Sequence, residues 1–177
     1  RRPVSHFVLG RFESLARAGS AVPALVRRGS KPAGLLLGLV DLPTPARRPP
    51  GLLPGFVPGQ PADVVIVPDV FTASLEASTL HRGVAVLASL GLDVAVAPFI
   101  PSGKFDHVKG NRVAFARAAE AQAGLVDRIV AAGSVPVVIE PAVALLHRHD
   151  SPRIRPGYPD GVRFLVEILD EHRDTLA

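Results

Sequence analysis

Three short apolar runs constrain the fold of this chain more than any other feature of its sequence. They occupy residues 64–67, 94–97 and 135–139 and are rich in valine. Continuous runs of β-branched and other apolar residues are typical of parallel strands that are covered by helices on both faces. Longer segments with helical periodicity separate the runs, so the sequence predicts βαβ units in an α/β fold with a short, Rossmann-like parallel sheet.

Helical periodicity accounts for most of the remaining regular pattern. The predicted helices cover residues 4–17, 72–90, 108–132, a short stretch that ends near 149, and 159–174. The apolar stripe of the second helix contains Leu75, Val86 and Leu90, and that of the third contains Phe115 and Ile129. These stripes are predicted to face the sheet.

Proline and glycine are dense before the first predicted strand, between residues 41 and 61. Such a composition interrupts both helices and strands, so this segment is expected to form no regular element. We therefore divide the chain into a helical lead-in (1–43), a proline- and glycine-rich linker (44–61) and an α/β domain (62–177). The lead-in is expected to be an N-terminal helical appendage to the domain.

Composition excludes several classes of function. The chain has no cysteine, so it holds no disulfide and offers no thiolate nucleophile and no cysteine ligand for zinc or an iron–sulfur cluster. The formal net charge of +4 is spread over scattered arginines with few aromatic residues between them, which disfavours a nucleic-acid partner. No apolar run approaches the roughly 20 residues of a membrane span, so we expect a cytoplasmic protein.

One loop carries most of the polar residues that could bind a ligand. It covers residues 98–110, after the second predicted strand, and loops at the carboxyl ends of parallel strands line the crevice where α/β proteins bind ligands. The candidate anion-binding residues of this basic loop are Ser102, Gly103, Lys104, His107 and Lys109. Hydroxyl, ammonium and imidazole donors beside a glycine that permits close approach suit a small anion.

The Gly103-Lys104 pair does not make this loop a P-loop. That motif needs a glycine five residues before the Gly-Lys pair and a serine or threonine after it, whereas this chain has Pro98 and Phe105 at those positions. The alternative to anion binding is that the lysines are solvated loop charges while His107 caps a helix or packs locally. Both interpretations stay open from the sequence.

Two carboxylates are expected at the same rim of the sheet. Asp69 follows the first predicted strand, and Glu140 follows the third. Right-handed crossovers bring the carboxyl ends of these strands to one edge of the sheet, so both crevice carboxylates are predicted to face the basic loop. The alternative is that Asp69 and Glu140 cap helices or neutralise the lysines as ion pairs.

No motif for catalysis or metal binding occurs elsewhere in the sequence. His147 and His149 are separated by one residue on a predicted helix, so they point in different directions, and no carboxylate stands at metal-ligand spacing. The chain has neither a Gly-x-Ser-x-Gly elbow nor a Gly-x-Gly-x-x-Gly fingerprint. We therefore assign no catalytic residue, no metal site and no cofactor to this chain.

Three segments together resemble a known family. They are residues 67–72, 98–110 and 138–150, and the second contains an unusual Pro-x-Gly-Lys-x-x-His-x-Lys-Gly pattern. These segments are similar to the C-terminal region of FAD-linked, iron–sulfur-containing oxidoreductases that oxidise D-2-hydroxy acids such as D-2-hydroxyglutarate or D-lactate, a glycolate-oxidase-like group. The resemblance covers about residues 4–150.

The resemblance implies a particular place in a larger protein. In that family an FAD-binding module and a ferredoxin-like module come first and a two-part, cysteine-rich region comes last, so FAD and the iron–sulfur cluster belong to other parts of the parent protein. This chain departs from the family where a Cys-Cys-Gly motif and a further cysteine are expected, because Ser102-Gly103-Lys104 and residues 142–146 stand there. It resembles a degenerate first half of the cysteine-rich region.

The expected function follows from this resemblance. The chain would be a cluster-free, structural or anion-capturing part of a D-2-hydroxyacid dehydrogenase, inactive alone, with the FAD and ferredoxin-like modules and a small carboxylate or other anion as its partners. The absence of methionine, even at position 1, agrees with a piece of a longer protein. The alternatives are a stand-alone module that binds a small anion and an interaction domain without a ligand.

Overall fold

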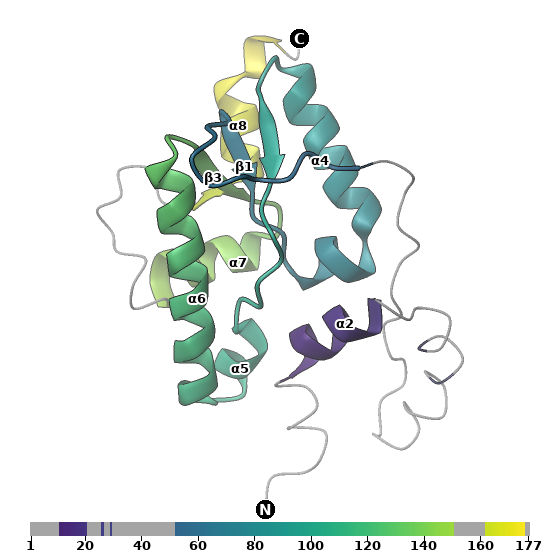
Figure 1. Ribbon diagram of the computed structural model, residues 1–177, viewed down its shortest axis with the longest axis vertical. Coiled ribbons are helices and arrows are strands. Elements are labelled where there is room, and N and C mark those ends of the chain that lie inside the picture. Colours follow the sequence, from purple (N-terminus) through teal and green to yellow (C-terminus); the bar gives the residue numbers. More distant parts are fainter. Residues whose placement is uncertain (1–10, 21–25, 27–28, 30–51, 151–161, 176–177) are drawn as a thin grey trace, which may run out of the picture.

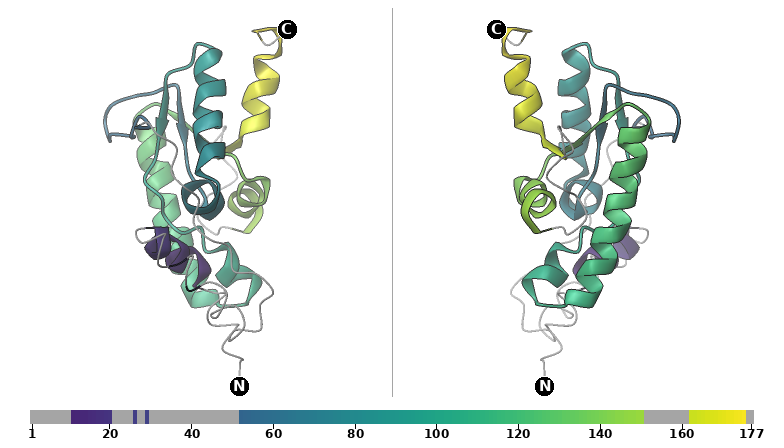
Figure 2. Two further views of the ribbon diagram at one scale, coloured as in Figure 1. Left: turned by 90° about the vertical axis from the view of Figure 1, so that its right-hand side faces the viewer. Right: turned by 90° about the vertical axis from the view of Figure 1, so that its left-hand side faces the viewer.

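The computed structural model describes residues 11–20, 26, 29, 52–150 and 162–175. In chain order its elements are α2 (Phe12–Ser20), β1 (Val64–Ile66), the π-helix η1 (Phe71–Leu75), α4 (Ala77–Ser89), β2 (Val94–Val96), α5 (Lys104–Val108), α6 (Arg112–Ala131), β3 (Val135–Val138), α7 (Pro141–Leu145), the π-helix η2 (Leu146–Asp150), β4 (Arg163–Phe164), α8 (Leu165–Glu171) and the 3-10 helix η3 (Arg173–Thr175). They form one four-stranded sheet with helices on both of its faces (Figure 1, Figure 2). No helix among the described residues is both long enough and apolar enough to cross a lipid bilayer.

All four strands run parallel, in the order β2-β1-β3-β4. β1 pairs with β2 on one side and with β3 on the other. The predicted α/β fold with a short parallel sheet is therefore confirmed, and the sheet has one strand more than the sequence predicted. The additional strand, β4, pairs Arg163 with Val137 and Phe164 with Val138 of β3.

The last predicted helix, 159–174, is wrong in its first half. Residues 159–161 lie outside the described part of the chain, β4 comes next, and α8 begins only at Leu165. A strand of two residues has no periodicity that a sequence can reveal. Its conformation comes from pairing with β3 and from the complete burial of the preceding Val162.

The core contains two large apolar clusters, one on each face of the sheet, and a smaller third cluster of Phe115, Ala119 and Leu146. Val65 of β1 belongs to a cluster with Val126 and Ile129 of α6. Ile66, the next residue of the same strand, belongs to a cluster with Leu87 of α4, to which α8 also contributes. Successive strand residues point to opposite faces, so helices on both faces require strands that are apolar at every position.

The predicted helix 72–90 is broken near its start. η1 forms first, the backbone leaves helical geometry at Glu76 (φ −130°, ψ 52°), and α4 follows. The break shifts the phase of α4, so its buried face carries Leu80 and Leu87, while Val86, which was predicted to lie in the apolar stripe, is 38% exposed. The apolar stripe that was predicted for one continuous helix over residues 72–90 is therefore wrong for α4.

The predicted helix 108–132 starts later than expected. The short helix α5 forms within the basic loop, and α6 begins after a turn at Gly110, whose φ is +69°. The predicted buried face of the long helix is confirmed at Phe115 and Ile129. The second half of the basic loop is thus helical, and Lys104 is its first helical residue.

Part of the predicted linker pairs with the sheet. The Phe56 N–H donates to the Val96 carbonyl at 2.9 Å, and the Val96 N–H donates to the Pro54 carbonyl at 2.7 Å, so this segment forms a parallel bridge beside β2. The described part of this segment, residues 52–61, contains no helix or strand, so the bridge is an isolated pairing beside the sheet. Pro54 contributes only its carbonyl, so its missing N–H is tolerated, and the pairing covers an edge of the sheet.

Most of the predicted lead-in, 1–43, lies outside the described residues, and the domain boundaries stay predictions. The predicted helix 4–17 corresponds to α2, which covers Phe12–Ser20, and residues 4–10 are outside the described part. α2 contacts η1 and lies apart from the sheet, near α5 (Figure 1).

Replacing Leu87 by alanine tests which face of α4 is buried. Leu87 has no exposed surface, so Leu87→Ala is expected to lower the free energy of unfolding by about 2–5 kcal/mol in urea denaturation. The matched control is Val86→Ala, which is expected to change the free energy of unfolding by less than about 1 kcal/mol because Val86 is partly exposed. A larger effect of Val86→Ala than of Leu87→Ala would contradict the phase of α4.

Candidate functional site

The strand order determines where a ligand site can form. β2 and β3 lie on opposite sides of β1, so the chain leaves β1 and β3 in different directions at the centre of the sheet. Open α/β sheets bind ligands at such a point, outside the carboxyl ends of the strands. η1, α5 and α7 follow β1, β2 and β3, and all three lie at the same end of the sheet (Figure 1). The structure therefore places the basic loop and both predicted carboxylates at one rim.

The donors at the start of the basic loop bind a carboxylate of the chain itself. Ser102 Oγ donates a hydrogen bond to Glu13 Oε1 at 2.6 Å, and the Gly103 N–H donates to Glu13 Oε2 at 2.9 Å. Glu13 belongs to α2 and precedes Ser102 by 89 positions. Glu13 and Ser102 are each only 4% exposed. We call Glu13, Ser102 and Gly103 the carboxylate clamp.

Gly103 is required by the geometry of this clamp. Its φ is +76°, in the left-handed region that favours glycine. A Cβ atom at this position would lie 2.7 Å from Ala118 Cβ and 3.1 Å from Phe115 Cδ2, both on α6. A side chain at position 103 would therefore force the loop away from α6 and move the N–H away from Glu13.

An aromatic contact holds α2 beside the clamp. The ring centroids of Phe12 and Phe105 are 5.0 Å apart, with an interplanar angle of 53°. Tilted aromatic pairs of this kind contribute about 0.5–1.5 kcal/mol beyond the burial of their surface. Two adjacent residues of α2, Phe12 and Glu13, thus attach this helix to the basic loop, one by an apolar contact and one by hydrogen bonds.

Burial raises the pKa of the Glu13 carboxyl above its ordinary value, and the negative charge of Asp106 adds to this increase. The hydrogen bonds from Ser102 and Gly103 lower the pKa but do not offset the loss of hydration. A raised carboxyl pKa means that folding favours the protonated form. The stability that this pKa shift contributes is therefore fully present below the pKa of the unfolded chain and is lost as the pH rises through the folded-state pKa.

Lys104 is paired with the predicted crevice carboxylate Glu140. Lys104 Nζ lies 3.3 Å from Glu140 Oε1, which also accepts a hydrogen bond from the Ala142 N–H at 3.2 Å and so caps α7. The two charged side chains are 27% and 28% exposed, and a pair at this depth contributes less than about 1 kcal/mol. Glu140 thus acts as both a helix cap and an ion-pair partner, which are the two alternatives to a ligand site.

Asp69 binds within its own turn. Its Oδ1 accepts hydrogen bonds from the N–H groups of Phe71 and Thr72 at 2.6 and 3.2 Å, and its Oδ2 accepts one from Thr72 Oγ1 at 2.9 Å. The residue is 4% exposed. Asp69 fixes the start of η1, and within the described residues no hydrogen bond or ion pair joins it to the basic loop.

The remaining predicted donors of the loop, His107 and Lys109, lie nearer the surface. His107 Nε2 is 3.7 Å from Asp150 Oδ2, and the His107 ring contacts Phe115 with the centroids 4.6 Å apart. Lys109 follows α5, and no other described residue forms an ion pair with its ammonium group. Internal groups thus occupy most of the predicted donors, and binding of an external anion by this loop stays a prediction.

Sequence reasoning missed Glu13 as the partner of this loop. The only signal is a carboxylate next to Phe12, beside the apolar stripe of the lead-in helix. Such a position is equally typical of a solvated helix residue. The hydrogen bonds of the buried Glu13 carboxylate join segments that are far apart in the chain, so local periodicity does not reveal them.

His147 is a second buried polar group of this region. It is 2% exposed, and neither of its ring nitrogens has a hydrogen-bond partner among the residues that the structure describes. Burial lowers the pKa of His147 to about 4, so its ring is neutral at neutral pH. His149 is exposed, so the two imidazoles share no site. No group of three or more histidine, aspartate or glutamate side chains in the described part of the chain is arranged to hold a metal ion.

The pH dependence of stability tests the burial of Glu13. Wild type loses the contribution of Glu13 to the free energy of unfolding as the pH rises above about 4.3, the pKa of a glutamate in an unfolded chain. Glu13→Gln has no carboxyl group and lacks this contribution. The free energy of unfolding of Glu13→Gln relative to wild type is therefore expected to increase with pH in urea denaturation.

Glu171→Gln is the matched control and is expected to show the opposite sign. A hydrogen bond from Arg163 lowers the pKa of the exposed Glu171 carboxyl, so wild type gains stability from this group as the pH rises through the folded-state pKa. The stability of Glu171→Gln relative to wild type should therefore decrease with pH. A decrease for Glu13→Gln as well would contradict a carboxylate that burial destabilises.

Comparison with known proteins finds similar curated proteins that share one name. No family model matches the sequence, and no solved structure matches it significantly. The chain is similar to curated proteins that are each named D-2-hydroxyglutarate dehydrogenase. The protein from Pantoea ananatis is 37% identical over 87 residues, which are 49% of this chain and 8% of that protein.

Two further relatives agree with this match. The Escherichia coli protein is 32% identical over 87 residues, which are 49% of this chain and 8% of that protein. The Pseudomonas putida protein is 29% identical over 178 aligned positions, which cover 89% of this chain and 18% of that protein. The chain thus spans less than a fifth of the length of these relatives, and the similarity supports its relation to the D-2-hydroxyacid dehydrogenases.

Proposed function

We propose that this chain is part of a D-2-hydroxyacid dehydrogenase and has a structural, cluster-free role in it. The observation that carries the proposal is the 37% identity to the D-2-hydroxyglutarate dehydrogenase of Pantoea ananatis over 49% of the chain. The parent protein would oxidise D-2-hydroxyglutarate or D-lactate with FAD and an iron–sulfur cluster that other modules hold. A chain without cysteine supplies no thiolate to such a cluster.

The carboxylate clamp supports a structural role. Ser102-Gly103-Lys104 stands where the family resemblance places a Cys-Cys-Gly motif. In place of thiolates this turn offers a hydroxyl and a backbone N–H, and both bind Glu13 of α2. In this proposal the degenerate motif holds the lead-in helix on the α/β domain, while the FAD and ferredoxin-like modules carry the redox chemistry in the cytoplasm.

A second candidate role is the capture of a small carboxylate or another anion at the rim. It is favoured by the position of Lys109 and by His107, which is 41% exposed beside it. Cations at the mouth of a crevice raise the local concentration of negatively charged metabolites. Ser102, Gly103 and Lys104 would contribute only if their internal partners were displaced.

Flavin reduction in the parent protein tests the proposed family. The purified full-length protein is expected to contain FAD and iron, and its flavin absorbance is expected to bleach when D-2-hydroxyglutarate or D-lactate is added. A protein without flavin, or with a flavin that no D-2-hydroxy acid reduces, would contradict the proposed parent.

Substitutions in this chain then distinguish the two roles. Lys104→Ala is expected to keep kcat within about threefold of wild type, because within the described part of the chain Lys104 forms an ion pair with Glu140 alone. Lys109→Ala decides between the two roles. An increased KM with an unchanged kcat would support anion capture, and no change in either constant would support the structural role. A loss of kcat of more than about a hundredfold in Lys104→Ala would assign a catalytic group to this chain and refute both roles.

A further inference from the structure

α2 buries a carboxylate against the α/β domain but little apolar surface. Among the described side chains of α2, Glu13 alone is buried. Phe12 is only partly buried where it contacts Phe105, and Leu15 is 51% exposed. A helix of nine residues is too short to be stable by itself in water, and packing of an apolar face usually stabilises such helices. The docking of α2 therefore depends mainly on the carboxylate clamp and on the contact between the two rings.

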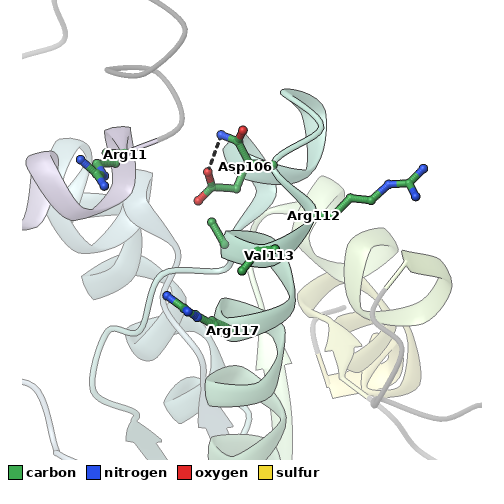
Figure 3. A pocket seen from close by; sticks show the side chains of 7 residues that line it. Arg11, Asp106, Arg112, Val113 and Arg117 are labelled. Carbon is green, nitrogen blue, oxygen red and sulfur yellow. Dashed lines mark hydrogen bonds between the residues drawn. The ribbon is translucent and has the colours of Figure 1, made fainter.

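A pocket separates the start of α2 from the first turns of α6 (Figure 3). Its volume is about 410 Å³, and it is lined by Arg11, by Asp106 of α5 and by residues of α6. Asp106 also acts on the clamp, because its negative charge contributes to the raised pKa of Glu13. The space between α2 and α6 is thus not filled by side chains, which again indicates that α2 is loosely docked.

The two donors of the clamp are held in place by the α/β domain itself. Ser102 Oγ accepts a hydrogen bond from the Lys104 N–H at 3.2 Å, so the hydroxyl proton is directed at the carboxylate. Gln122 of α6, which is 1% exposed, donates from Nε2 to the Ile100 carbonyl at 2.5 Å and fixes the loop just before the clamp. Neither bond involves α2, so both donors are expected to keep their positions when α2 leaves.

We propose that Glu13 is a tethered ligand of a carboxylate-binding site, and that a free small carboxylate competes with it for the Ser102 hydroxyl and the Gly103 N–H. Binding of the free carboxylate releases α2 from the basic loop. The geometry of the bound state is that of Glu13, whose two oxygens each accept a hydrogen bond from one of these donors. This inference rests on the second candidate role, anion capture at the rim, and adds to it the contact that keeps the site closed.

The environment of Glu13 permits such an exchange. Burial and the charge of Asp106 make the ionised Glu13 carboxyl less favourable in the clamp than in water, as its raised pKa indicates. A free carboxylate brings no helix with it, so it keeps more of its hydration at the same two donors. Glu13 has the advantage of its covalent connection, which corresponds to an effective concentration on the order of millimolar. A free carboxylate at roughly 10 mM and above therefore competes with Glu13.

Titration of the complete 177-residue chain with sodium acetate at neutral pH tests the site, with the Gly103 amide followed by NMR. Glu13→Ala removes the internal competitor and is expected to bind acetate at least about tenfold more tightly than wild type. Adding Ser102→Ala to Glu13→Ala removes one of the two donors and is expected to weaken this binding at least about tenfold. Ser14→Ala, at an exposed position of α2, is the matched control and is expected to bind acetate as wild type does.

Release of α2 has a separate readout that needs no substitution and is therefore independent of folding defects. The Leu15 N–H donates to the Arg11 carbonyl at 2.9 Å. Its hydrogen exchange in wild type is expected to become faster in acetate, because an undocked helix of this length unfolds. Sodium chloride at the same ionic strength is the control and is expected to have no such effect.

Three results would each overturn the inference. They are an absence of saturable acetate binding to Glu13→Ala up to about 100 mM, equally tight binding to the double variant or to Ser14→Ala, and the same exchange rate of the Leu15 amide in acetate and in chloride. Flavin that no D-2-hydroxy acid reduces would refute the proposed parent protein but would leave these results unchanged. The failure of the inference and the failure of the proposed function are therefore distinguishable.

Discussion

A carboxylate that is removed from water needs hydrogen-bond donors inside the protein, and Glu13 finds them in the loop that follows β2. Without such donors its burial would cost on the order of several kcal/mol. Ser102 Oγ and the Gly103 N–H supply two hydrogen bonds. The attachment of α2 to the basic loop depends on this interaction together with the aromatic contact between Phe12 and Phe105.

The other carboxylates at the rim of the sheet, Asp69 and Glu140, also bind partners within the chain. Asp69 binds the turn that contains Thr72, and Glu140 caps α7 while it pairs with Lys104. Parallel strands favour this arrangement, because each strand is followed by the start of a helix whose first N–H groups lack partners within the helix. Carboxylates at these positions satisfy the backbone first, so a rim rich in charge does not by itself indicate a bound ligand.

The features that the sequence predicted correctly depend on local pattern. Continuous apolar runs located three strands, and helical periodicity located the buried face of α6 through Phe115 and Ile129. β4 was missed because its two residues become a strand only by pairing with β3. For the candidate site, the sequence identified Ser102 and Gly103 as donors to an anion, and the structure provides Glu13 as an internal carboxylate. That partner is distant in the chain, so no local pattern predicts it.

Hydrogen exchange at the Gly103 amide measures the carboxylate clamp most directly. This N–H donates to a buried carboxylate, and hydrogen bonds to charged groups contribute about 1.5–3 kcal/mol, so exchange is expected to be at least about tenfold faster in Glu13→Ala than in wild type. The Gly91 amide, which donates to the Ala88 carbonyl at the end of α4, is the internal control and should not change. Equal exchange rates of the Gly103 amide in wild type and Glu13→Ala would contradict the dependence of this region on Glu13.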